Sequence, residues 1–392
     1  MKEFLEGSMA IAKIVGRCRP GVVSAYPITP QTHIVEELAQ MVADGHLNAQ
    51  FVNVESEHSA ASVVLGAEAT GVRAYTATSS QGLFLMAEVV FNIAGMRLPL
   101  VMTDANRAIS APINIWNDLQ DTISLRDAGW VQIYAENLQE AVDFHAIAYK
   151  LAEDHRVMLP VMVCMDGFIL THGIETVDMP SQEDVDKFLP PYKALYKLDV
   201  DKPETLGPLA DPDYYLEARY ALHQTLKESL AIMPEVMDGF AKQFGRQYGL
   251  VEAYQVKDAE KVIVAMGSVC GTIKDVVDEM RAKGKKVGML KITSFRPFPA
   301  DAICDALKNV PRVAVLDKAV SLGGDAPIAA EIRSAFCGSK KRPQTISSFV
   351  AGLGGRDITV ESVKEIFKLL TAQEKNGEFI DLKPELLKEK YE

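Results

Sequence analysis

Two side chains early in the chain are placed where acid–base and substrate-binding chemistry could occur. Glu57 lies in Val54–Ala61, where a strand-like segment gives way to a helix of small residues. A carboxyl there can share a proton with a ligand, or it can cap the helix, because negative charge is favourable at a helix N-terminus. Thr29 stands between two prolines in Tyr26–Pro30, which stiffen the loop around its hydroxyl. The same spacing also fits a plain turn with Thr29 near a helix N-cap.

A guanidinium and a hydroxyl-rich loop add two further candidates. Arg107 follows the apolar segment Leu98–Thr103, and its planar fork suits a substrate carboxylate. The alternative is an internal salt bridge to Asp104 or Asp118. The loop Thr76–Leu83 opens a helical segment, so its backbone N–H groups could hold a polar ligand. Its hydroxyls could equally satisfy one another in Ser/Thr turns.

The elements around these residues predict an α/β fold. Strands are expected at 22–26, 50–54, 73–77, 98–103 and 157–165, and helices at 32–43, 60–70 and 83–95. Such alternation is typical of a doubly wound, mostly parallel sheet with helices on both faces. Each candidate follows a strand, and the carboxyl ends of parallel strands meet at one edge of the sheet.

The pattern divides the chain into three parts. Residues 1–185 form the first α/β domain, and residues 186–250 form a proline-rich connector with a helix from Tyr214 to about Phe244. Alternation returns in residues 251–392, which we expect to form a smaller second α/β domain. The strand-to-helix turn at Ala265–Gly271 lacks G-x-G-x-x-G spacing, so it gives little support for a dinucleotide site.

Composition excludes several classes of protein. With 53 acidic and 41 basic residues, the net charge of −12 argues against a nucleic-acid partner. The five cysteines form no C-x-x-C pair, so no iron–sulfur or zinc site and no metal ligand is predicted within this chain. No signal-peptide core and no apolar run of membrane-spanning length is evident, so we expect a cytoplasmic protein without a membrane contact.

Read together, these segments resemble the α subunits of 2-oxoacid:ferredoxin oxidoreductases, in particular those of the pyruvate type. The matching stretches are 26–32, 54–61, 79–86, 106–121, 159–172, 292–299 and 349–357. They run over almost the full length, and Tyr-Pro-Ile-Thr-Pro at 26–30 is specific to this family.

The resemblance implies a fold and a set of partners. The first domain would be the pyrimidine-binding domain of a thiamine diphosphate enzyme, and the second would resemble the C-terminal domain of transketolase. The diphosphate, Mg²⁺ and a [4Fe-4S] cluster would belong to a β subunit, which agrees with the lack of any Gly-Asp-Gly in this chain. Further γ and δ subunits would supply a ferredoxin-like module. Coenzyme A would be the co-substrate, and ferredoxin or another acceptor would take the electrons.

The resemblance also implies roles for individual residues. Glu57 would be the catalytic residue that hydrogen-bonds N1′ of the aminopyrimidine, so that the 4′-nitrogen can take a proton from the thiazolium. Thr29 and Arg107 would hold the carboxylate and the carbonyl of the substrate. The cofactor-binding residues implied by the resemblance are Pro27, Ile28, Thr29, Glu57 and Gln81.

The implied activity is oxidative decarboxylation of a 2-oxoacid to acyl-CoA and CO₂, with pyruvate as the first candidate. Many pyruvate-type relatives carry His where this chain has Leu119, which leaves 2-oxoisovalerate or phenylglyoxylate as alternatives. Two hypotheses of other kinds remain open. One is a transketolase-like or synthase subunit that passes no electrons on, and the other is a scaffold subunit without catalysis.

Overall fold

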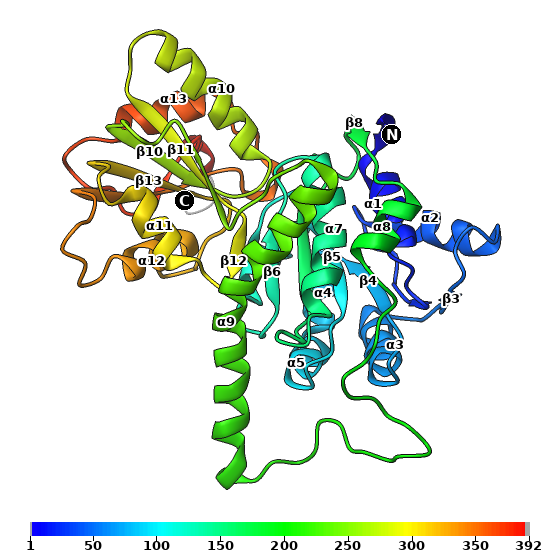
Figure 1. The fold of residues 1–392 in the computed structure, drawn as a ribbon. Coiled ribbons are helices and arrows are strands. Elements are labelled where there is room, and N and C mark those ends of the chain that lie inside the picture. The colour runs from blue at the N-terminus through cyan, green and yellow to red at the C-terminus, as the bar shows by residue number, and fades with distance from the viewer. Residues whose placement is uncertain (1, 389–392) are drawn as a thin grey trace. The chain divides into compact units, whose positions relative to one another are not determined.

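The computed structural model describes residues 2–388 and divides the chain into two compact units. The first unit comprises the residues up to Leu250 together with the segment Thr293–Pro299. The second unit comprises Val251–Ile292 and the residues from Ala300 onward. Each unit is built on its own sheet (Figure 1). The two units are described separately below.

The first unit contains a seven-stranded sheet in the order β12–β6–β7–β5–β4–β2–β3. Its strands are β2 (Val22–Val23), β3 (Gln50–Phe51), β4 (Ala74–Thr78), β5 (Val101–Asn106), β6 (Val131–Tyr134), β7 (Val161–Asp166) and β12 (Ser294–Arg296). All neighbours are parallel except β12, which pairs antiparallel with β6. Strands β4, β5, β6 and β7 are fully buried, as expected for parallel strands covered on both faces.

The helices of this unit form two groups that cover the sheet (Figure 1). Their bounds are α1 (Gly7–Arg17), α2 (Thr32–Ala43), α3 (Glu57–Ala69), α4 (Gln81–Leu85), α5 (Ala87–Gly95), α6 (Gln120–Ser124), α7 (Leu138–Ala152), α8 (Gln182–Phe188) and α9 (Pro212–Phe244). Helices α1, α7 and α8 contact one another, as do α3, α4 and α5. A separate two-stranded antiparallel sheet joins β1 (Lys2–Glu6) to β8 (Ile174–Asp178).

The long helix α9 belongs partly to the core of the first unit. It begins at an Asp211 cap followed by Pro212, both typical of a helix start. Its C-terminal half buries Met233, Met237 and Phe240 in the core of this unit. Its N-terminal turns are exposed, and the extended segment before it runs to that end of the helix (Figure 1).

The second unit is a smaller α/β structure with a six-stranded sheet in the order β15–β14–β13–β10–β11–β9. Its strands are β9 (Val251–Tyr254), β10 (Lys261–Ala265), β11 (Val287–Ile292), β13 (Arg312–Asp317), β14 (Thr345–Val350) and β15 (Glu378–Phe379). Its helices are α10 (Val269–Ala282), α11 (Ala300–Leu307), α12 (Pro327–Ala335), α13 (Val360–Leu369) and α14 (Glu385–Lys388), with a 3₁₀ turn at Leu353–Gly355. Among the described strands of this sheet only β9 runs antiparallel to its neighbour. The predictions of a mostly parallel sheet in the first domain and of a smaller second α/β domain are confirmed.

Several elements differ from those expected from the sequence. The helix expected from residue 60 begins at Glu57, and the helix expected over 83–95 is two helices, α4 and α5. Strand β6 and helices α1 and α7 were missed. Helix α7 is buried on nearly every side, so it lacks the polar face that makes helical periodicity visible.

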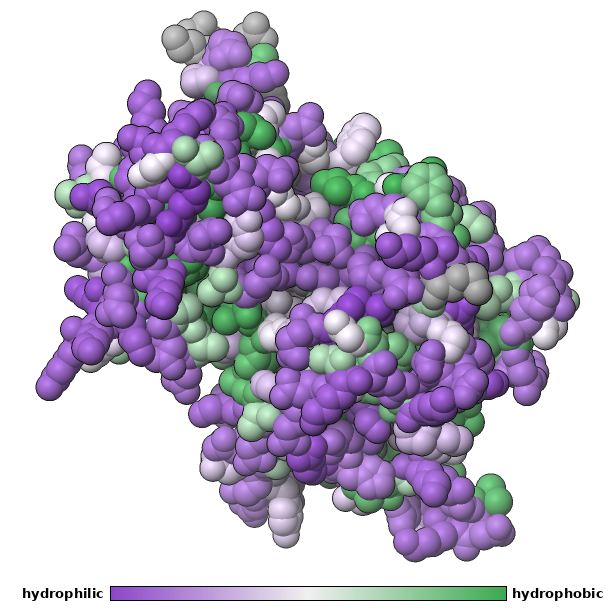
Figure 2. Space-filling model, turned by 45° about the horizontal axis from the view of Figure 1, so that its top comes forward, coloured by the Kyte–Doolittle hydropathy of each residue, from purple (hydrophilic) through white to green (hydrophobic). Residues whose placement is uncertain are grey.

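Polar residues cover most of the face seen in Figure 2, where hydrophobic residues appear in scattered groups. Among residues 2–388, every helix is too short or too polar to cross a lipid bilayer.

Candidate active site

The four candidate loops lie at one edge of the sheet in the first unit. They follow β2, β3, β4 and β5, which are neighbours in the order β5–β4–β2–β3 and run parallel. Because all four strands point the same way, their carboxyl ends present these loops side by side. The sheet therefore collects residues from 26 to 121 of the sequence in one region.

Glu57 is the first residue of α3, but it does not cap the helix. The cap is Ser56, whose hydroxyl accepts a hydrogen bond from Ser59 N at 3.2 Å. Glu55 is exposed and accepts from the Ser59 hydroxyl at 2.7 Å. The Glu57 side chain is only 8% exposed, and no residue within 2–388 donates a hydrogen bond to it. Its carboxyl is therefore available to a ligand.

Gly82 in α4 lies directly against this carboxyl. A Cβ at Gly82 would lie 2.8 Å from Glu57 Oε1 and 2.5 Å from Thr78 Oγ1, so no side chain fits there. Thr78 Oγ1 is itself buried without a hydrogen-bond partner in the described chain. Glycine at position 82 thus lets α4 pack closely against Glu57 and Thr78.

Arg107 and Thr29 are in direct contact. The Arg107 Nη1 group donates to the Thr29 carbonyl oxygen at 2.9 Å, and its Nε donates to the Asn114 carbonyl oxygen at 2.8 Å. No carboxylate of residues 2–388 forms an ion pair with this guanidinium, so the salt bridge to Asp104 or Asp118 does not form. Burial lowers the pKa of Arg107, and the charge of Asp121 opposes that shift. A partly buried cation held by neutral carbonyls attracts an anionic ligand.

Asp121, which the sequence analysis missed as a site residue, holds the loops after β4 and β5 together. Its Oδ2 accepts from the backbone N–H groups of Ser80 and Arg107, at 3.1 and 2.8 Å. Its Oδ1 accepts from Asn106 Nδ2 at 2.9 Å and from Thr122 N at 2.8 Å. By accepting a hydrogen bond from Arg107 N, the Asp121 carboxyl holds the backbone of Arg107 in place. In the sequence Asp121 appears as an ordinary acidic residue, and in the structure it lies in the first turn of the short helix α6.

Gln31 is a second residue that the sequence analysis missed. It is fully buried, and its Nε2 donates to the Tyr26 carbonyl at 3.0 Å and to the Ala77 carbonyl at 2.8 Å. These bonds attach the loop after β2 to the end of β4. Of the loop residues between them, Pro27 and Thr29 are exposed and Ile28 is half-buried, so they form an open rim.

The hydroxyl-rich loop satisfies itself in part. Ser79 Oγ donates to the Ala105 carbonyl at 2.7 Å, and Ser80 Oγ donates to the Ala108 carbonyl at 2.5 Å. Gln81 contacts the Ser80 hydroxyl through Oε1 and donates to the Ser110 hydroxyl through Nε2. The Ser hydroxyls are therefore structural, and Gln81 lies at the rim, partly exposed.

The residues fit the pyrimidine half of thiamine diphosphate. A buried carboxyl at Glu57 without a partner in the described chain suits a ring nitrogen, and the buried Thr78 Oγ1 on the same side of Gly82 is a second polar atom without a partner there. No acidic Gly-Asp-Gly loop for a diphosphate–Mg²⁺ group occurs in the sequence. The residues of this chain therefore fit the pyrimidine of the cofactor, and the sequence has no such loop for its diphosphate.

Comparison with known proteins defines the class of this chain. A family model described as "Pyruvate flavodoxin/ferredoxin oxidoreductase, thiamine diP-bdg" matches residues 13–238, and one described as "Pyruvate:ferredoxin oxidoreductase core domain II" matches residues 259–363. The chain belongs to the pyruvate flavodoxin/ferredoxin oxidoreductase family, and its first unit carries the thiamine diphosphate-binding domain of that family. This confirms the resemblance drawn from the sequence.

Particular relatives narrow the comparison. The chain is 50% identical over 383 residues to the pyruvate synthase subunit PorA of Methanothermobacter thermautotrophicus, covering 98% of this chain and 99% of the relative. It is 44% identical over 368 residues to the ketoisovalerate oxidoreductase subunit VorA of Pyrococcus abyssi, covering 93% of this chain and 92% of the relative.

Two solved structures share the fold. One is a 2-oxoglutarate:ferredoxin oxidoreductase from Magnetococcus marinus with 2-oxoglutarate, coenzyme A and succinyl-CoA bound, with a TM-score of 0.70 and 22% identity. This chain is covered to 93% and spans 65% of that longer chain. The other is a split-gene transketolase, an inactive β4 tetramer, with a TM-score of 0.54, 11% identity and coverage of 94% and 95%. The transketolase-like fold expected from the sequence is thereby confirmed.

Proposed function

We propose that this chain is the α subunit of a pyruvate:ferredoxin oxidoreductase and that Glu57, Thr29 and Arg107 form its half of the active site. The proposal rests mainly on Glu57, a buried carboxyl with no partner among residues 2–388, at the start of a helix in a thiamine diphosphate-binding domain. Relatives that are 45–51% identical over more than nine-tenths of this chain carry the name pyruvate synthase subunit PorA.

Each residue of this chain has a defined task in the proposed reaction. Thiamine diphosphate, when bound, supplies the carbon nucleophile and accepts the electron pair released with CO₂. The Glu57 carboxyl holds a proton at N1′ of the pyrimidine. Arg107 binds the 2-oxoacid carboxylate through the N–H groups that its two carbonyl contacts leave available. The Thr29 hydroxyl donates to the carbonyl oxygen of the substrate, while Pro27, Ile28 and Gln81 border the pyrimidine.

The proposed site is completed by other chains. A β subunit would bring the diphosphate-binding loop, Mg²⁺ and a [4Fe-4S] cluster, and γ and δ subunits would add the ferredoxin-like module. Three features support this division of the site. The chain has no Gly-Asp-Gly and no C-x-x-C, its relatives are named as subunits, and large hydrophobic side chains are exposed near the site. These exposed side chains are Tyr26, Phe84, Leu85, Ile113 and Trp116.

The choice of substrate rests on the relatives. Pyruvate is favoured because the PorA proteins are the more similar ones, and 2-oxoisovalerate is the second candidate because the VorA relative is 44% identical. Leu119 is fully buried in this chain, so an influence of this position on substrate choice would come through packing. Initial rates of viologen-dye reduction with coenzyme A and either pyruvate or 2-oxoisovalerate would rank the two substrates.

The decisive experiment compares two neighbouring carboxylates. In the purified complex, Glu57→Gln should lower the rate of pyruvate-dependent dye reduction by about 10²-fold or more, because an amide cannot share the proton at N1′. The matched control is Glu55→Gln, an exposed carboxylate of the same loop that accepts a hydrogen bond from the Ser59 hydroxyl. Cofactor content and cluster reduction by dithionite are measured in both variants to show that the complex is assembled. Activity of Glu57→Gln close to that of Glu55→Gln would remove Glu57 from the mechanism.

A further inference from the structure

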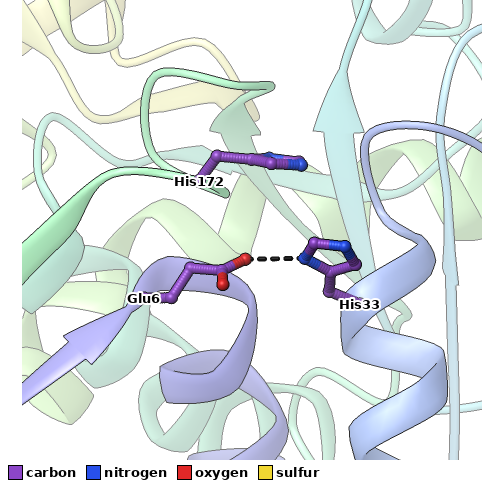
Figure 3. Close-up of side chains that lie close together, drawn as sticks. All are labelled: Glu6, His33 and His172. Atoms are coloured by element: carbon purple, nitrogen blue, oxygen red, sulfur yellow. Dashed lines mark hydrogen bonds and ion pairs between the residues drawn. The ribbon is translucent and has the colours of Figure 1, made fainter.

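Three potential metal-binding side chains meet outside the proposed active site. Glu6 ends β1, His33 lies in the first turn of α2, and His172 follows β7. One ligand atom from each lies within 4.8 Å of the others. Figure 3 shows the His172 ring above the Glu6 carboxylate, with the His33 ring facing that carboxylate from α2. Segments far apart in the sequence thus place two imidazoles and one carboxylate around a common point.

The spacing is close to that of a metal site. Glu6 Oε1 and His33 Nδ1 are 2.7 Å apart, joined by a hydrogen bond. Zinc–nitrogen and zinc–oxygen bonds of about 2.0–2.2 Å place two tetrahedral ligand atoms roughly 3.3 Å apart. An ion would therefore replace the shared proton with a small opening of this pair and a small approach of His172. The His33 side chain is 47% exposed, so it is free to make that adjustment.

The third ligand is already oriented. His172 Nδ1 lies 2.8 Å from the Thr171 hydroxyl, and the ring packs 4.7 Å from Phe168 and 5.0 Å from His33, centroid to centroid. Thr171 Oγ1 also accepts from Phe168 N at 2.8 Å, and its second lone pair can accept the Nδ1–H of the imidazole. In the tautomer that donates from Nδ1, Nε2 of His172 has a free lone pair for a metal ion. A hydroxyl or carbonyl behind the distal nitrogen is the usual support of a metal-bound histidine.

We propose that Glu6, His33 and His172 form a binding site for a divalent transition-metal ion of the zinc type. Two imidazoles and one carboxylate suit zinc and its first-row neighbours, whereas Mg²⁺ and Ca²⁺ require oxygen ligands. The remaining coordination positions open to solvent on the His33 side. The sequence predicted no metal ligand in this chain, because residues 6, 33 and 172 form no recognisable spacing.

The position of this site gives the ion a structural task. It would tie the N-terminal strand and the turn after β7 to the first turn of α2, which directly follows the Tyr26–Gln31 loop. Within the described residues, β1 otherwise pairs only with β8. The ion would therefore fix the beginning of α2 and, through it, the loop that carries Thr29.

Zinc titration of the tag-free full-length chain tests the proposal. Wild type should bind one equivalent of Zn²⁺, and a large excess of Mg²⁺ should not compete. His33→Ala and His172→Ala should each weaken binding at least about tenfold. His46→Ala is the matched control, because His46 is an exposed histidine just beyond the C-terminus of the same helix, and its affinity should equal that of wild type. Equal Zn²⁺ binding in all four proteins, or none in wild type, overturns the proposal.

A second experiment locates the ion in wild-type crystals, so its result does not depend on whether the variants fold. Anomalous scattering at the zinc edge from wild-type crystals soaked in Zn²⁺ should give a peak between the three side chains. Zn²⁺ should also raise the thermal unfolding midpoint of wild type and of His46→Ala by at least about 2 °C at saturating ion. Anomalous peaks that occur only elsewhere in the crystal would contradict the site.

Discussion

Arg107 donates from Nη1 to the carbonyl oxygen of Thr29 at 2.9 Å, across 78 positions of the sequence. This bond joins the loop after β2 to the loop after β5 and aligns the two proposed substrate-binding residues. Neither partner of the guanidinium is charged, because the second contact is the Asn114 carbonyl. The positive charge is therefore available to a substrate carboxylate.

Replacing this guanidinium by an amine should weaken substrate binding. In Arg107→Lys the charge remains, but a lysine cannot contact Thr29, Asn114 and a carboxylate with one planar fork. We expect KM for pyruvate to rise roughly 10–100-fold, the equivalent of one lost charged hydrogen bond, with a smaller change in kcat. Steady-state dye reduction gives both constants. The control is Arg156→Lys, an exposed arginine paired with Asp154 and Glu235, which should leave KM unchanged. A KM for Arg107→Lys equal to that of the control would end the carboxylate-binding assignment.

Glycine at position 82 should be essential for the position of Glu57. In Gly82→Ala the new methyl group would lie 2.8 Å from Glu57 Oε1, so the carboxyl or the helix has to move. We expect at least a tenfold loss of activity, as small displacements of a catalytic group are costly. Gly66→Ala in α3 is the control, because nothing lies within 4 Å of its Cβ position. That substitution should keep activity and add about 0.5–1 kcal/mol to the free energy of unfolding. Equal activities of the two variants would show that Glu57 tolerates the shift.

How much of this site could be read from the sequence depends on how each residue is positioned. Thr29, Glu57 and Arg107 were accessible because each follows a strand, and parallel strands end at a common edge. Gln31 and Gly82 were not, since their importance lies in contacts with residues about 25–50 positions away. No local pattern encodes such contacts.

The same reasoning applies to the fold. The second unit was predicted as an α/β structure because its strands and amphipathic helices alternate regularly. In the first unit, α7 has almost no exposed face, so its residues show no helical period of polarity. The edge strand β12 comes after Leu250 in the sequence, yet it pairs with β6 in the sheet of the first unit. A sequence pattern alone does not reveal such a long-range pairing.

A buried carboxyl in the second unit should make its stability depend on pH. Asp317 accepts hydrogen bonds from Ile328 N and Ala329 N, yet burial raises its pKa to about 7. The unfolded chain releases this proton near pH 4, so the folded state binds the proton more tightly between about pH 4 and 7. The contribution of Asp317 to the free energy of unfolding therefore decreases as pH rises through that range and is constant above it.

The variant Asp317→Asn removes this titration. Relative to wild type, the variant should gain stability between about pH 4 and pH 7, as measured by hydrogen exchange of the β10 amides. The exposed Asp305→Asn should show no such trend. A stability difference between Asp317→Asn and wild type that does not change with pH would mean that Asp317 is ionised throughout.

Two buried carboxyls beneath Arg107 are chemically distinct. Asp121 receives four N–H donors, which favour its ionised form against the burial that raises its pKa. Burial and the charge of Asp121 together raise the pKa of Asp104 well above its ordinary value. Asp104 Oδ2 has no hydrogen-bond partner within the described chain, so nothing there stabilises a negative charge on it. We therefore expect Asp104 to be the member of the pair that is protonated first as pH falls.

Replacing each carboxyl by an amide of the same shape, in Asp104→Asn and Asp121→Asn, should affect stability differently at the two positions. If Asp104 is neutral in the folded protein, Asp104→Asn replaces it with a neutral group of the same shape and should fold as well as wild type at neutral pH. Asp121→Asn instead turns an N–H group toward backbone donors at Ser80 or Thr122 and should cost about 3 kcal/mol or more. Both tryptophans lie in the first unit, at 116 and 130, so fluorescence during urea unfolding reports on that unit alone. Because the folded-state pKa of Asp104 is raised, wild type should lose stability relative to Asp104→Asn as pH rises. Equal destabilisation by both amides would place the proton equally on the two carboxyls and refute the assignment.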